Sequence, residues 1–190
     1  TAVGKGDRMS EYFDKAIPGL FSAAVHKLHQ AINKQKDEFT RSGSNGLSHS
    51  RFPICVQEDC FEAVRAYSKA LLNRLEQFAH DDRVVDAGDY DTAARSLREF
   101  SAKAEEIYED IRKQGEPFND RRPHMDKTKM QSVVASATND IREHRAVLTT
   151  RQSFKKWLMS DLRKVGLAPT VVALLAGLVG ALLATWLGLR

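Results

Sequence analysis

Residues 91–114 read DTAARSLREFSAKAEEIYEDIRKQ, and their apolar side chains recur every three or four positions. Such spacing places one apolar face along a helix of 3.6 residues per turn and leaves the opposite face polar. The members of this stripe are Ala94, Leu97, Phe100, Ala104, Ile107, Tyr108 and Ile111. Gly115 and Pro117 follow at once, as expected where a helix ends. The stretch therefore predicts a long amphipathic helix.

The same helical period recurs on both sides of this stretch. A short helix ending near Ile17 precedes a longer one that Pro18 opens, and another helix runs from about Val56 to His80. A fourth begins after Asp126, a residue suited to an N-cap. No segment alternates strictly between apolar and polar residues, so no strand is expected. The fold class predicted is all-α: an antiparallel bundle of about four long helices over residues 1–150, followed by one C-terminal transmembrane helix.

The fourth helix is predicted to continue toward the C-terminus with little interruption. Its apolar stripe extends through Val147, Phe154, Trp157 and Leu158 into residues 151–164, which are basic. We expect five cations of this juxtamembrane helix to contact anionic lipid headgroups. They are Arg151, Lys155, Lys156, Arg163 and Lys164.

The segment 165–189, VGLAPTVVALLAGLVGALLATWLGL, is 25 residues long and carries no formal charge. About 20 apolar residues, at roughly 1.5 Å rise each, cross a hydrocarbon core of about 30 Å. The segment therefore predicts a transmembrane helix. Five cations precede it and only Arg190 follows, which places the N-terminal domain on the cytoplasmic, matrix or stromal side of an organellar or bacterial inner membrane.

Small residues recur every four positions on two adjacent stripes of this segment. They are Ala173, Gly177 and Ala181 on one stripe, and Gly180, Ala184 and Gly188 on the other. Small residues at this spacing let two helix backbones approach closely in lipid. We expect the span to pack against another helix, either in a second copy of the chain or in a different subunit.

The distribution of charge excludes a general nucleic-acid-binding surface. The whole chain has a formal charge of +4, but residues 1–150 hold nearly equal numbers of acidic and basic residues. The excess of cations lies beside the apolar segment, so no specific nucleic-acid partner is expected.

The chain contains no phosphate-binding loop, no G-x-S-x-G elbow and no H-E-x-x-H or Glu-x-x-His pair, so neither a cofactor nor a metal is expected. Cys55 and Cys60 lack the C-x-x-C spacing of redox and zinc sites, and we expect two unpaired thiols.

One short motif points to an enzyme. Residues 74–80, RLEQFAH, resemble the Arg-x(4–6)-His pattern of the HEPN ribonucleases, which are also helical. In that family the Arg and His meet at a dimer interface and cleave RNA without a metal, so the resemblance implies Arg74 and His80 as catalytic residues. The resemblance covers seven residues, and Leu75 stands where a polar residue often follows the Arg. The same stretch also suits a helix whose Leu75 and Phe78 face a core.

The preferred expectation from these features is a non-catalytic, single-pass, C-terminally anchored subunit of a membrane protein complex. The chain begins at Thr1, which suits a mature mitochondrial inner-membrane protein freed of its targeting peptide, and equally suits an excerpt. The alternative is a membrane-acting effector, such as an oligomeric pore-forming toxin or defence protein. Thr170 and Thr185 are the only hydroxyl-bearing residues of the segment, which disfavours a water-filled pore. A membrane-anchored HEPN-like ribonuclease is the third reading.

Overall fold

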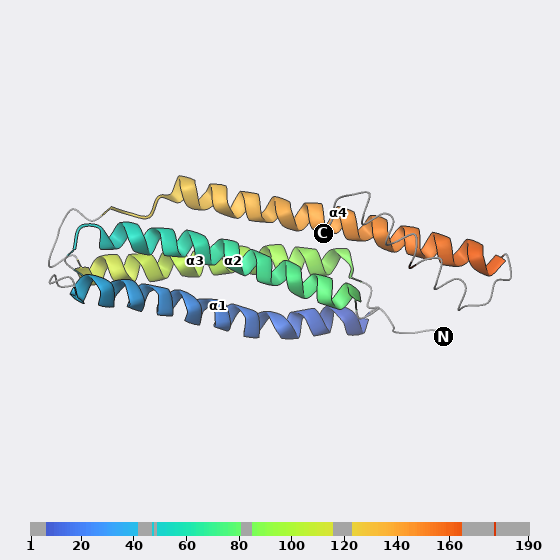
Figure 1. The fold of residues 1–190 in the computed structure, drawn as a ribbon, viewed down its shortest axis with the longest axis horizontal. Coiled ribbons are helices and arrows are strands. Elements are labelled where there is room, and N and C mark those ends of the chain that lie inside the picture. Colours follow the sequence, from blue (N-terminus) through green and yellow to red (C-terminus); the bar gives the residue numbers. More distant parts are fainter. Residues whose placement is uncertain are drawn as a thin grey trace. The chain divides into compact units, whose positions relative to one another are not determined.

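The computed structural model describes residues 7–41, 47, 49–80, 85–115, 123–164 and 177. Within these ranges it contains four helices and no strand, so the predicted all-α class is confirmed (Figure 1). The helices are α1 (Asp7–Arg41), α2 (Phe52–His80), α3 (Ala87–Gly115) and α4 (Lys127–Lys164). The chain divides into two compact units, residues 1–144 and residues 145–190.

The predicted span 165–189 lies outside the described residues, apart from Gly177. Among the helices that are described, none has the length and apolar character needed to cross a bilayer.

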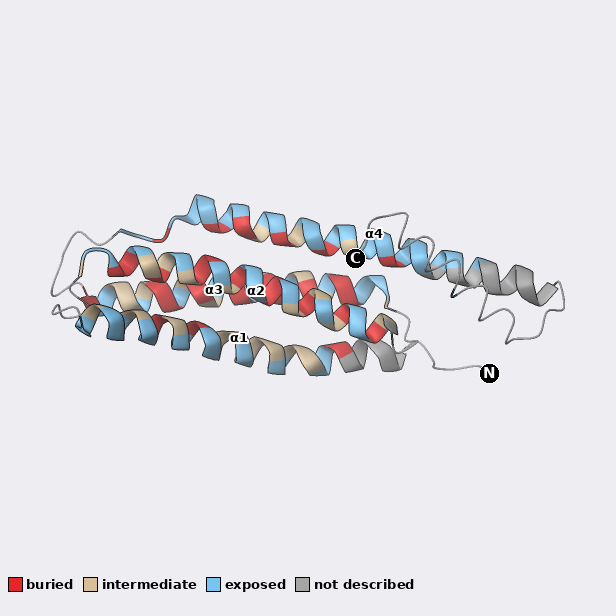
Figure 2. Ribbon diagram, viewed as in Figure 1, coloured by how far each residue is buried: buried red, intermediate tan, exposed pale blue. Residues whose placement is uncertain are grey.

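Helices α1, α2 and α3 pack against one another, with α2 antiparallel to both α1 and α3 (Figure 1). Their shared core contains an aromatic cluster with one residue from each helix: Phe21, Tyr67 and Phe100. The Phe100 ring lies edge-on to Phe21, at 5.6 Å between centroids, and 4.6 Å from the ring of Tyr67. Tyr67 also makes a 2.6 Å hydrogen bond with the buried Ser96 hydroxyl. Figure 2 shows buried positions concentrated along α2 and α3.

The first half of α4 adds the fourth helix of this unit. Its buried residues recur at helical spacing: Met130, Val133, Ala137 and Ile141. Polar contacts fix its beginning, because the Asp126 amide donates to Gln57 at 2.8 Å and the Lys129 ammonium lies 2.5 Å from the Glu58 carboxylate. Gln57 and Glu58 lie near the start of α2, so α2 and α4 run parallel. Residues 127–144 thus close a bundle with α1–α3.

Helix α1 differs from the prediction, because it passes through Pro18 without ending. Proline inside a helix removes one backbone hydrogen bond and costs about 3 kcal/mol. Buried residues on both sides of Pro18 offset that loss. Phe13 is 1% exposed and lies edge-on to Phe78 of α2, while Leu28 is equally buried in the second half of α1. Packing against α2 therefore favours one continuous helix over two.

Two other helices begin earlier than the sequence indicated. Helix α2 starts at Phe52 rather than near Val56, with Pro53 in its first turn, where a missing N–H is tolerated. Helix α3 starts at Ala87 rather than Asp91, behind a reciprocal cap. The Asp86 carboxylate accepts the amides of Gly88 and Asp89, and the Asp89 carboxylate accepts the amide of Asp86. The predicted N-cap Asp126 is confirmed, since its carboxylate accepts the Lys129 amide at 2.9 Å.

Replacing Asp86 with Ala should destabilise the bundle by about 0.5–2 kcal/mol, because two amides in the first turn of α3 would lose their acceptor. Thermal unfolding followed by circular dichroism measures the change. Asp91→Ala is the matched control, since Asp91 is exposed one turn later. Equal unfolding temperatures for Asp86→Ala and the wild type would show that the cap contributes nothing.

Candidate functional site

The basic part of α4 is the first candidate site. Arg151 is exposed, and its contact with lipid headgroups stays a prediction. Lys155, Lys156, Arg163 and Lys164 lie within the helix, and their side chains fall outside the described residues.

The same part of α4 carries exposed apolar residues that the sequence did not distinguish from core residues. Phe154 is 42% exposed and Trp157 is 59% exposed, and their rings lie 5.8 Å apart. Val147 is exposed as well. The periodicity of the sequence placed these residues on an apolar stripe. It could not show that no neighbouring side chain among the described residues covers them.

The predicted helix-packing stripes of residues 165–189 lie almost wholly outside the described residues. Gly177 is the exception: it is exposed, and a Cβ built on it meets no atom within 4 Å. The other members, Ala173, Gly180, Ala181, Ala184 and Gly188, stay predictions.

The recorded contacts of the Arg74 side chain all lie within its own helix, α2. Its guanidinium donates to Gln77 at 3.0 Å and lies over the Phe78 ring, 4.7 Å from the centroid. His80 is the last residue of α2, and its side chain lies outside the described residues. Six residues on one helix turn through roughly 600°, so these two positions lie on different faces. A catalytic pair would therefore need a second copy of the chain.

A polar cluster that the sequence did not reveal joins three helices. His144 of α4 has its Nε2 atom 3.1 Å from the Glu76 carboxylate of α2 and its Nδ1 atom 3.2 Å from the Tyr90 hydroxyl of α3. With Nε2 donating to the carboxylate, Nδ1 accepts the hydroxyl proton. Both ring nitrogens are thus engaged by the protein. The cluster fixes the end of the bundled part of α4 and leaves no nitrogen of His144 for a substrate.

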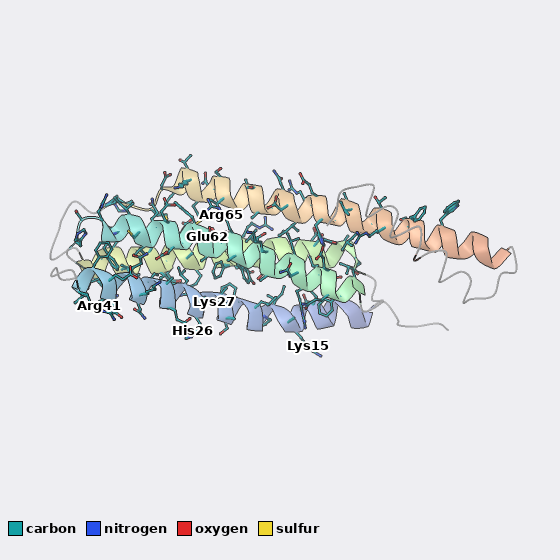
Figure 3. The ribbon with its side chains drawn as sticks, viewed as in Figure 1. Lys15, His26, Lys27, Arg41, Glu62 and Arg65 are labelled. Atoms are coloured by element: carbon teal, nitrogen blue, oxygen red, sulfur yellow. The ribbon has the colours of Figure 1, made fainter. Side chains whose placement is uncertain are left out.

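An open groove runs between α1 and α2, with a volume of about 280 Å³. Half of the residues that line it are alanines: Ala23, Ala24 and Ala31 of α1, and Ala63, Ala66 and Ala70 of α2. Lys27 and Glu62 lie on its two sides (Figure 3). The acidic residues of its lining are Asp59 and Glu62.

Asp59 lines this groove and has a carboxylate oxygen, Oδ2, that is buried without a hydrogen-bond partner. Burial, followed by the charge of Glu38, raises the pKa of this carboxyl group above its ordinary value of 3.8. The folded protein therefore binds this proton more tightly than the unfolded chain does.

Replacing Asp59 with Asn should stabilise the protein at pH 7. A raised pKa in the folded state means that stability falls as the pH rises above 3.8, because the buried carboxylate must ionise. The gain should shrink toward zero near the pH at which aspartate is protonated in both states. Unfolding temperatures of the variant and the wild type, measured at pH 7 and at a pH below 3.8, test the prediction. Asp140→Asn, at an exposed position, is the control. A variant less stable than the wild type at pH 7 would contradict the prediction.

The two cysteines are unpaired, as predicted. Cys60 is buried, its thiol lies 3.6 Å from the Ala104 carbonyl oxygen, and burial raises its pKa to about 12. Cys55 is half-buried, and its pKa is also raised, chiefly by burial. Neither thiol has the lowered pKa of a catalytic nucleophile. Across the described ranges, no group of three or more His, Cys, Asp or Glu residues could hold a metal ion.

Comparison of the chain with protein-family models, with curated proteins and with solved structures finds no match.

Proposed function

We propose that the protein is a non-catalytic, single-pass, C-terminally anchored subunit of a membrane protein complex. The observation that carries the proposal lies in α4. This helix exposes Phe154 and Trp157 among cations and ends at Lys164, immediately before 25 uncharged residues. Aromatic and basic residues beside a long apolar segment are typical of the boundary between water and a bilayer.

In this proposal the segment 165–189 crosses the membrane, and the basic helix before it contacts anionic headgroups. The excess of cations on the N-terminal side keeps the helical bundle on the cytoplasmic, matrix or stromal face of an organellar or bacterial inner membrane. The small-residue stripes of the span pack against another subunit or a second copy.

The polar clusters of the bundle support a structural role over a catalytic one. The imidazole of His144 is engaged on both sides, and the guanidinium of Arg74 lies over an aromatic ring of its own helix. The contacts of His144 tie α4 to α2 and α3, whereas the contacts of Arg74 lie within α2. In this proposal the outer surface of the bundle binds neighbouring subunits of the complex.

Extraction in a gentle detergent, followed by native mass spectrometry, tests the proposal. We expect a particle heavier than the 21.3 kDa chain, containing companion chains or further copies. A Gly177→Ile variant should release companions held through the small-residue stripe. Leu178→Ile, the next residue, is the matched control and should keep them. A lone 21.3 kDa species from the wild type would overturn the subunit assignment.

A further inference from the structure

The exposed apolar residues of α4 form a cluster rather than scattered positions. Val147, Phe154 and Trp157 are 58%, 42% and 59% exposed and lie within 11 residues of one another. Ile54 of α2 is the one other large apolar side chain recorded as exposed among the described residues. Single exposed apolar residues are common on protein surfaces, whereas a cluster indicates a binding surface.

The helical register gathers the exposed apolar residues of α4 on one side of the helix. At about 100° per residue, Val147, Phe154 and position 158 fall within roughly 40° of one another, and Trp157 lies beside them. Positions 145, 156 and 163, all basic in sequence, fall on the opposite side of the helix, whereas Arg151 and Asp161 fall about 40° to either side of Val147. Asp161 is the single acidic residue from position 145 to 164, against six basic residues.

We propose that residues 147–162 of α4 bind a lipid surface, lying in the interface with Val147, Phe154 and Trp157 among the lipid chains. An apolar face backed by Lys and Arg is the pattern of helices that lie on anionic membranes. The charge complements anionic headgroups, and the helix ends next to the uncharged segment 165–189. This inference rests on the proposed membrane anchor, and to the headgroup contact of the basic helix it adds insertion of the exposed apolar residues among the lipid chains.

The two tryptophans of the chain allow each contact to be measured separately. Full-length Trp186→Phe retains only Trp157, and full-length Trp157→Phe retains only Trp186. Each variant is reconstituted into vesicles of phosphatidylcholine and phosphatidylglycerol containing lipids brominated near the headgroup. Emission is then measured with these lipids and, separately, with acrylamide as the aqueous quencher.

We expect the brominated lipids to remove most of the Trp157 emission and acrylamide to remove little. Efficient acrylamide quenching of Trp157 without lipid quenching would place this face in water and overturn the inference. Shielding of Trp157 from both quenchers would mean that a protein surface covers it, which also overturns the inference. Trp186 reports on the anchor itself: if no lipid quencher at any depth reaches Trp186, the proposed function fails instead.

A second substitution tests whether the apolar face causes the binding. Phe154→Ser in the Trp186→Phe chain should lose most of the lipid quenching of Trp157. Ser153→Ala, at the exposed neighbouring position, should leave the quenching unchanged. Equal quenching in both variants would overturn the role assigned to this face.

Discussion

Replacing Phe100 with Ala should lower the free energy of unfolding by about 3–5 kcal/mol, the usual loss for a large aromatic side chain in a core. Phe100 is fully buried and contacts the rings of Phe21 and Tyr67, so its removal leaves a cavity where α1, α2 and α3 meet. The free energy of unfolding of an ordinary domain is about 5–15 kcal/mol, so this loss is a large share of the total stability.

Thermal unfolding of the full-length protein in a mild detergent measures this effect. At about 2–4 °C per kcal/mol for a chain of this size, the unfolding temperature should fall by roughly 6–20 °C. Ile54→Ala is the control, because Ile54 is 52% exposed on α2, and its unfolding temperature should stay close to that of the wild type. If both variants unfold at the same temperature, the aromatic cluster is not the centre of the core.

Placing two arginines in the apolar segment should abolish membrane integration. Each arginine at the centre of a span opposes insertion by about 2.5–3.5 kcal/mol on the translocon scale. A Leu175→Arg, Val179→Arg chain therefore loses about 5–7 kcal/mol of the insertion free energy, which shifts partitioning by roughly 10³- to 10⁵-fold.

Resistance to alkaline carbonate extraction measures integration directly. The wild type should stay in the membrane pellet, and the double-arginine chain should move to the supernatant. Leu175→Ala, Val179→Ala alters the same two positions without adding charge and should remain in the pellet. Retention of the double-arginine chain in the pellet would contradict a membrane span.

Local sequence rules were enough to predict the helices with strong caps and stripes. Asp126 was recognisable as an N-cap, and Gly115 as the end of α3, because each acts within a few residues of its own position. Helix α3 began earlier than predicted because Asp86 and Asp89 form a reciprocal cap inside a run that otherwise resembled a polar loop. The spacing of Asp86 and Asp89, three residues apart, was the sequence feature that could have indicated this cap.

Contacts between distant residues account for what the sequence could not predict. The local rule that proline ends a helix was overridden at Pro18 by burial of Phe13 against Phe78, which lies 65 positions further along the chain. The cluster of Glu76, Tyr90 and His144 likewise depends on how three helices pack. No spacing within one helix could indicate it.

The contrast between the two thiols makes the chain ready for site-specific labelling. Burial raises the pKa of the Cys60 thiol to about 12 and keeps reagents away from it. Cys55, five residues earlier, retains partial access to solvent. A maleimide dye applied to the native protein should therefore attach at a single position, near the beginning of α2. Distances from that dye to a labelled companion could then be followed by energy transfer without removing either cysteine.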